Sequence, residues 1–187
     1  MIDKTTYYII ENNELHYHRE MSIKANADIP EIVDKFIWTG NTKKSEFPLP
    51  RDNIRAIAKT DAPIGIWNYF RVIFNETLFK GKDSKPFSYK WPPISDYKSS
   101  SPFVSTSTNE PTKKLTLVIH LGSEYAGKEL VLEEFRAIEC MKEISTKTVE
   151  FDNSGRFEWT PERIKRFRYY RARWNWNPDE PVPSTHQ

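Results

Sequence analysis

Three of the four histidines stand where their imidazoles could meet at one metal ion. His16 and His18 are separated by one residue, so a β-strand would place both on the same face. His120 lies in a second segment with a strand pattern, and imidazole nitrogens are common zinc ligands. The glycines expected around a metal-holding β-barrel are absent, however, and His120 falls opposite the leucine face of its strand. We therefore predict no metal site.

The other candidates for catalysis lack the residues that would activate them. Cys140 is the only cysteine and has no catalytic motif around it, and the serines at 99–101 lack the Gly-x-Ser-x-Gly context of a nucleophile elbow. The turn at 122–127 contains two glycines but no following Lys-Ser or Lys-Thr, so it does not resemble a phosphate-binding loop. We predict no catalytic residue and no cofactor, which favours a non-enzymatic protein.

A basic segment near the C-terminus is the strongest candidate for a binding surface. As a strand it would place Tyr170, Ala172, Trp174 and Trp176 in the core and the basic residues outside. Arginine forks bind phosphate or carboxylate, and a tyrosine ring supplies a stacking platform. The alternative is that nearby glutamates, such as Glu133, Glu134, Glu139 and Glu143, neutralise the arginines within the fold. The candidate residues are Lys165, Arg168, Tyr169, Arg171 and Arg173.

Aromatic residues make up 14% of the chain, more than a core of this size requires. Some rings are therefore expected on the surface, where Trp and Tyr mark binding sites. We place Trp91 and Tyr97 on exposed loops and add them to the candidate binding residues, with Trp174 and Trp176 as further candidates on the side of the tail.

Length and composition indicate one soluble domain. The 187 residues suit a single domain over 1–176, followed by a flexible, proline-containing tail over 177–187. The net charge is only +2, and no apolar run approaches the roughly 20 residues needed to span a bilayer. A single cysteine forms no internal disulfide, and the first residues lack a secretory signal, so we expect a cytoplasmic protein without membrane contact.

Short alternating segments dominate the chain. Residues 114–122 form the clearest one, with Leu115, Leu117, Ile119 and Leu121 on one face, and predict a central strand. Residues 5–11 and 14–24 flank Asn12 and Asn13 and predict a hairpin. Further strands are expected at 36–40, 54–58, 67–79 and 87–91, and the serine-rich run 95–109 is expected to be an exposed loop containing an edge strand at 103–106.

Some segments allow two interpretations. Residues 128–144 and 160–176 suit either a helix or a strand, and we favour a strand in both, after one helical turn at Pro161. A short helix is also expected to begin at Asp28. Residues 147–152 and 156–160 flank a turn, and we predict that they pair as a hairpin.

The sequence thus predicts an all-β domain, an antiparallel β-sandwich or partly closed barrel with one or two helical turns. Its expected role is to bind another protein through exposed aromatic and basic residues, either alone or as a subunit of a larger assembly. Two alternatives stay open. One is binding of single-stranded nucleic acid or a nucleotide at the C-terminal arginines, and the other is carbohydrate binding by exposed tryptophans.

Overall fold

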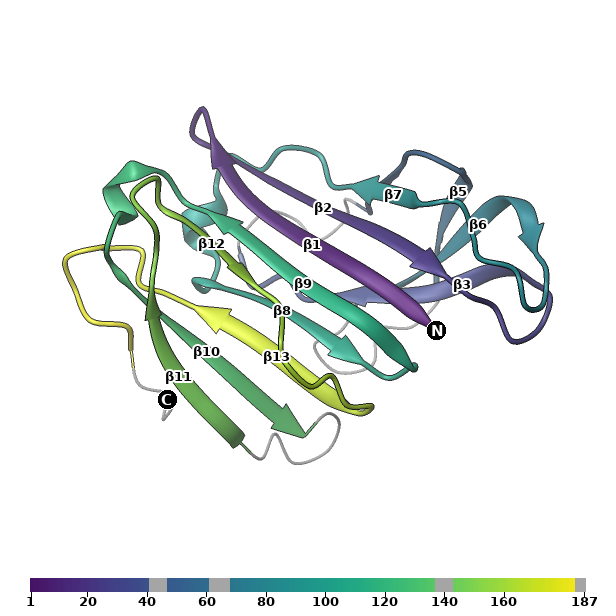
Figure 1. The fold of residues 1–187 in the computed structure, drawn as a ribbon. Helices are drawn as coiled ribbons and strands as arrows, with labels where there is room; N and C mark the ends of the chain where they lie inside the picture. The colour runs from purple at the N-terminus through teal and green to yellow at the C-terminus, as the bar shows by residue number, and fades with distance from the viewer. Residues whose placement is uncertain (41–46, 61–67, 137–142, 184–187) are drawn as a thin grey trace.

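The computed structural model describes residues 1–40, 47–60, 68–136 and 143–183. These residues form thirteen β-strands, two 3-10 turns at Tyr97–Ser99 and Ser123–Tyr125, and no α-helix. The strands make three sheets, mostly antiparallel, and none of the sheets closes into a barrel (Figure 1). The prediction of an all-β sandwich is confirmed.

The largest sheet has six strands and forms one complete layer. In spatial order they are β12 (Arg156–Trp159), β9 (Thr112–His120), β1 (Ile2–Glu11), β2 (Glu14–Ile23), β7 (Phe87–Lys90) and β4 (Leu49–Pro50). The predicted central strand is β9, with Leu115, Leu117 and Ile119 fully buried. It runs parallel to β1, whereas every other pairing in this sheet is antiparallel.

Two smaller sheets form the second layer. One has four strands, in the order β11 (Glu143–Glu150), β10 (Glu129–Arg136), β13 (Arg168–Arg173) and β8 (Phe103–Thr108). The other has three, in the order β3 (Ile29–Phe36), β6 (Asn68–Leu78) and β5 (Ile54–Lys59). Both cover the same face of the six-stranded sheet, because the residues of β2 that pack against them alternate along one side of that strand.

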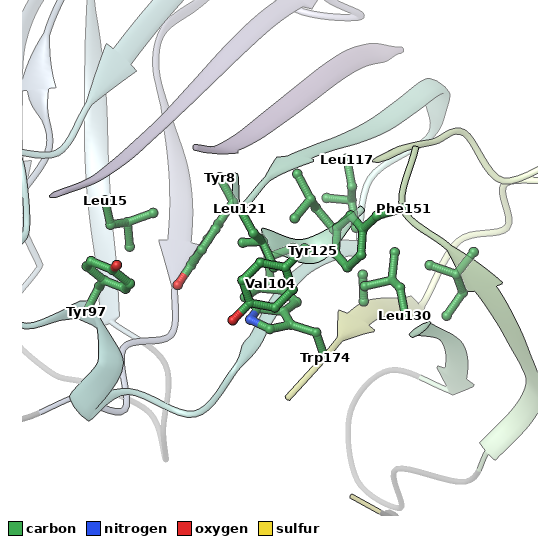
Figure 2. Packing of buried hydrophobic residues seen from close by; sticks show 13 residues of the cluster. Tyr8, Leu15, Tyr97, Val104, Leu117, Leu121, Tyr125, Leu130, Phe151 and Trp174 are labelled. Atoms are coloured by element: carbon green, nitrogen blue, oxygen red, sulfur yellow. The ribbon is translucent and has the colours of Figure 1, made fainter. Parts of the chain in front are cut away.

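The core consists of two clusters of buried residues, one under each of the two smaller sheets. Under the four-stranded sheet, Trp174, Leu130 and Val104 meet Tyr8 and residues of β9, as Figure 2 shows. Under the three-stranded sheet, a second cluster is built mainly from aromatic rings. Its aromatic members are Phe36, Phe70, Phe74, Phe87, Tyr89 and Trp91. Tyr17 and Trp38 pack against both clusters and mark the place where they meet.

The N-terminal hairpin is confirmed. β1 and β2 pair from Ile2 with Ile23 to Glu11 with Glu14. Asn12 and Asn13 connect them with φ angles of 51° and 63°, the left-handed conformation that a two-residue hairpin turn requires. The edge strand expected at 103–106 is also present, as β8.

Only Phe36 of the strand expected at 36–40 lies in a strand, because β3 ends there. Four further expectations about local structure are wrong. No helix begins at Asp28, because the following residues form β3. Residues after Pro161 form bends and turns without a helical turn, and strand β13 begins at Arg168. The run 95–109 is not a simple exposed loop, since Tyr97 is buried and β8 occupies its second half. Segment 128–144 contains strand β10, as favoured, while 137–142 lie outside the described residues.

The fourth error is the hairpin predicted at 147–152 and 156–160. β11 pairs with β10 and β12 pairs with β9, so the two segments belong to different layers. The turn between them is fixed by Asp152, whose carboxylate accepts hydrogen bonds from the backbone of Ser154 and Arg156. Gly155 packs so closely on Gly122 that a Cβ atom would lie 1.7 Å from the Gly122 carbonyl oxygen. The turn therefore carries the chain from one layer to the other.

Candidate binding site between the sheets

An aromatic cavity opens where the two core clusters meet. It offers about 70 Å³ of solvent space beside β8, between the end of β3, the end of β7 and the β1–β2 hairpin. The aromatic residues that line it are Tyr8, Tyr17, Phe36, Trp38, Trp91 and Phe103. Aliphatic walls come from Leu15, Ile94 and Val104. The cavity is therefore a largely apolar recess in the second layer.

Contacts between aromatic rings fix the walls of the cavity. The centroids of Tyr17 and Trp91 lie 4.6 Å apart, and those of Phe36 and Trp91 lie 5.1 Å apart. The backbone nitrogen of Trp91 donates to the Tyr17 carbonyl at 2.9 Å, which extends the pairing of β2 beyond the end of β7. Aromatic pairs of this kind contribute roughly 0.5–1.5 kcal/mol each beyond their buried area. The walls are thus preorganised by packing.

Polar atoms at the cavity are uncharged. Ser100, Ser101, Ser105 and Thr39 line it with hydroxyl groups, and the Ser101 backbone nitrogen donates to Thr39 Oγ1 at 2.8 Å. Burial raises the pKa of Tyr8, so its hydroxyl keeps its proton at neutral pH. The buried indole nitrogen of Trp91 finds no hydrogen-bond acceptor in the part of the chain that the structure describes. These groups suit a ligand that is mostly apolar.

A buried charged cluster lies next to the cavity. Asp34 on β3 accepts from Lys4 Nζ at 3.3 Å and from Arg19 Nη1 at 2.9 Å, and the Tyr89 hydroxyl also donates to it. Arg19 Nη2 donates to the Tyr17 hydroxyl at 2.9 Å, which connects this cluster to the cavity wall. The cluster therefore links the three-stranded sheet to three strands of the six-stranded sheet.

The pKa shifts in this cluster follow from burial and close opposite charges. Burial and the nearby Arg19 lower the pKa of Lys4 to about 8, despite the opposing effect of Asp34. Burial alone would raise the pKa of Asp34, but Lys4 and Arg19 outweigh it and hold that pKa well below its usual range. Burial and the Asp34 carboxylate raise the pKa of Tyr89. At neutral pH the cluster therefore holds an ionised carboxylate between two cations.

The two predicted aromatic binding residues are not on the surface. Trp91 is 5% exposed and Tyr97 is 4% exposed, so the expectation of exposed rings is wrong at both positions. Trp91 lies on the inner face of its sheet and lines the cavity. Tyr97 instead packs edge-on against Trp176, with ring centroids 5.4 Å apart. Only Trp91 therefore belongs to the candidate site.

The C-terminal basic residues do not form one free basic face. Arg171 and Arg173 donate through Nε to the two oxygens of Glu133, at 2.6 Å and 2.9 Å. Arg168 points to the opposite face of β13 and pairs with Glu134 at 3.1 Å. This is the neutralised arrangement that the sequence left open. Tyr169 is buried, so the expected stacking platform is not available, and Lys165 is exposed in the preceding turn.

The sequence patterns did not point to most residues of the cavity or to any residue of the buried charged cluster. The alternation of inward and outward residues in the predicted β1–β2 hairpin did indicate that two of its cations are buried. Lys4 shares a strand face with Tyr8, and Arg19 shares one with Leu15 and Met21, so both cations had to point into the core. Their partner Asp34 was hidden by the expectation of a helix at the start of β3.

The sequence matches no protein-family model and no curated protein. Among residues 1–40, 47–60, 68–136 and 143–183, no three His, Cys, Asp or Glu side chains are grouped to hold a metal ion. The same residues contain no helix long and apolar enough to cross a membrane. Cys140 lies outside them.

Proposed function

We propose that this chain is a non-enzymatic module that binds a partner protein, and that an apolar side chain of the partner enters the aromatic cavity. The cavity is the observation that carries the proposal. Protein interfaces are anchored by a few residues that fill well-packed pockets, and Trp and Tyr are enriched at such anchor points. Here Tyr17, Trp38 and Trp91 form such a pocket at the junction of the two core clusters.

The size of the cavity supports a side chain as its occupant. Pockets for small molecules and cofactors usually measure roughly 300–1,000 Å³, whereas this one offers about 70 Å³. A cavity of this size accepts a part of a larger partner. The residues that line it include no Asp, Glu, His, Lys or Arg among those described, so its chemistry favours burial of an apolar group.

A peptide selection tests the proposal. Linear 12-residue peptides displayed on phage are selected against the full chain and counter-selected against Ser101→Trp, which places a large ring at the exposed rim of the cavity. Thr148→Trp adds the same ring on exposed strand β11, far from the cavity lining, and serves as the matched control. We expect peptides with an aliphatic or aromatic anchor whose affinity falls at least tenfold in Ser101→Trp and stays unchanged in Thr148→Trp.

Selected peptides that bind all three proteins equally would contradict the proposal. So would a failure to select any peptide that distinguishes the unmodified chain from Ser101→Trp. Circular dichroism and thermal melting of both variants establish that the added ring has not unfolded the protein.

Nucleic-acid binding at the C-terminal arginines has weaker support. Each of the three arginines in β13 already pairs with a glutamate, and Tyr169 is buried. A protein that neutralises several phosphates loses affinity steeply as salt rises. Fluorescence anisotropy with a labelled oligonucleotide at two salt concentrations would separate that function from protein binding. The third alternative, carbohydrate binding, lacks an exposed tryptophan among the five that the structure describes.

A further inference from the structure

The second layer is interrupted along a seam between its two sheets. β8 is one edge strand of the four-stranded sheet, and β3 is one edge strand of the three-stranded sheet. The aromatic cavity lies between 36–39 and 100–105, and a larger cavity of about 520 Å³ lies between 29–35 and 107–112. Numbers rise along β3 as they fall along β8, so the two edges face each other in opposite directions (Figure 1). We call this gap the seam.

Backbone groups of β3 point into the seam at alternate residues. Opposite Lys35, the Tyr69 carbonyl accepts from Thr60, so it points toward β5 and away from β3. Lys35 and Tyr69 are therefore a non-hydrogen-bonded pair, and the same holds for Val33, two residues away. The N–H and C=O of Lys35 and Val33 consequently face the seam rather than β6.

The same alternation applies to β8. Trp174 donates its backbone N–H to the Pro102 carbonyl at 3.0 Å, which makes them a hydrogen-bonded pair with β13. The odd-numbered residues that follow, Ser105 and Ser107, then direct their N–H and C=O groups away from β13 and toward the seam. Both edges of the seam therefore present rows of backbone donors and acceptors.

Part of the seam is already closed by the protein itself. The Lys35 nitrogen donates to Asp34 Oδ1 at 2.8 Å, and the Lys35 carbonyl accepts from Arg19 Nη1 at 2.7 Å. At the other end, the Ser101 nitrogen is occupied by Thr39 Oγ1. Among the described residues, no side chain covers the Val33 backbone in this way, and the Val33 side chain is 59% exposed. The open stretch of the β3 edge is therefore centred on Val33, beside the larger cavity.

We propose that the partner enters the seam as an extended strand that pairs with β3 at Val33 and with β8 at Ser107, while one of its side chains fills the aromatic cavity. The proposal rests on the protein-binding function proposed above and names the form of the partner. Addition of an extended segment to an open sheet edge is a recurring mode of peptide recognition. An inserted strand would run parallel to one edge and antiparallel to the other, and would join the two smaller sheets into one continuous layer.

Proline variants at the two edges test the pairing. Val33→Pro and Ser107→Pro each remove one N–H that faces the seam, and neither N–H takes part in the ladder with β6 or β13. Val33→Ala and Ser107→Ala keep the N–H and serve as matched controls. With the synthetic peptide from the phage selection as the probe, we expect roughly tenfold weaker binding in each proline variant, the loss of about one hydrogen bond, and little change in the alanine variants.

N-methylation of the peptide gives a second test that leaves the protein unchanged. Successive N–H groups of a strand point to opposite sides. A strand inserted between two edges therefore loses affinity when either of two adjacent amides in its paired region is methylated. A strand added to one edge loses affinity only at every second position. Loss of affinity at only every second methylated amide, or in only one of the two proline variants, would overturn insertion of the peptide between the two edges.

The outcomes separate this inference from the function on which it rests. A peptide that distinguishes the unmodified chain from Ser101→Trp, yet tolerates N-methylation and both proline variants, supports the cavity as an anchor and overturns strand insertion. Failure to obtain such a peptide overturns both. A complex that instead contains two copies of this chain, seen by light scattering in the absence of peptide, also overturns the proposal.

Discussion

Two carboxylates in this protein are each held by two cations, in very different surroundings. Asp34 lies between Lys4 and Arg19, and all three side chains are at least 90% buried between the layers. Glu133 lies between Arg171 and Arg173 on the outer face of the four-stranded sheet. Glu133 is fully buried, but its arginines keep 17% and 15% of their side-chain surface exposed. Each group carries a formal net charge of +1.

The difference lies in what the ions connect. Glu133 stands directly across from Arg171 in the β10–β13 ladder, so its ion pairs reinforce strands that are already hydrogen bonded. Asp34 instead joins a strand of the three-stranded sheet to β1, β2 and β7 of the opposite layer. A similar arrangement of charges thus strengthens one sheet in the first case and connects two sheets in the second.

The largest effect is expected from Asp34→Asn. This change keeps the size of the side chain and removes the only negative charge that Lys4 and Arg19 contact in the described structure. Leaving buried cations uncompensated typically costs about 3–5 kcal/mol of unfolding free energy. Urea denaturation measures the loss. A cost below about 1 kcal/mol would mean that the cations reach water, and would remove the contrast with Glu133.

The pH dependence of the unfolding free energy should reveal the lowered pKa of Lys4. Its pKa is lowered from 10.5 to about 8 on folding, so the unfolded state binds more protons between these values. The unfolding free energy should therefore rise with pH, by about 2 kcal/mol between pH 7 and pH 9.5. Denaturation of the unmodified chain and of Lys4→Met at both pH values isolates this contribution, since the variant should lack it. Equal slopes in the two proteins would contradict the shift.

Glu133→Gln should destabilise less than Asp34→Asn. Arg171 and Arg173 are partly exposed, so water can compensate for the lost carboxylate, and we expect a cost of about 1–2 kcal/mol. Glu134→Gln on the same strand, whose carboxylate is 20% exposed and pairs with Arg168, is the matched control and should cost less. If chemical denaturation gave Glu133→Gln and Asp34→Asn equal losses of unfolding free energy, exposure of the cations would not determine the cost of removing their carboxylate.

The smallest effect is expected at the surface. Asp179 pairs with Lys128 at 2.8 Å, but its side chain is 81% exposed. Exposed ion pairs contribute about 0–1 kcal/mol, so Asp179→Asn should change the unfolding free energy by less than about 0.5 kcal/mol. The same urea experiment measures it and sets the baseline for the two carboxylate clusters. A larger loss would show that this contact holds residues 177–183 against the fold.

Period-two alternation predicted the strands well where each strand has one apolar face. It located β9, the β1–β2 hairpin, the inward residues Tyr170 and Ala172 of β13, and the buried Trp174 directly after that strand. It did not predict which strands pair, because adjacent alternating segments resemble a hairpin whether or not they share a sheet. β11 and β12 were misassigned for that reason, since the close contact of Gly155 with Gly122 depends on distant residues.

The candidate site was harder to predict than the fold. The cavity brings together residues from β1, β2, β6 and β8 with residues at the end of β3 and beyond the ends of β3 and β7, and no short segment of sequence contains more than a few of them. The arginines of β13 gave a clear local signal, but their charge is balanced by glutamates of β10 that lie more than thirty residues earlier. Pairing across the fold decides whether such a basic segment is available to a ligand.

The parallel pairing of β1 with β9 has a consequence for the order of folding. β2 follows β1 directly, whereas the other edge of β1 pairs with the distant β9 in the described structure, where Thr5 lies beside Thr116. During synthesis the β1–β2 hairpin therefore emerges with one side of β1 unpaired until residues 112–120 have been made. Such distant pairing slows folding and leaves a strand edge open to other chains in the meantime. We expect this protein to depend on chaperones more than its modest size suggests.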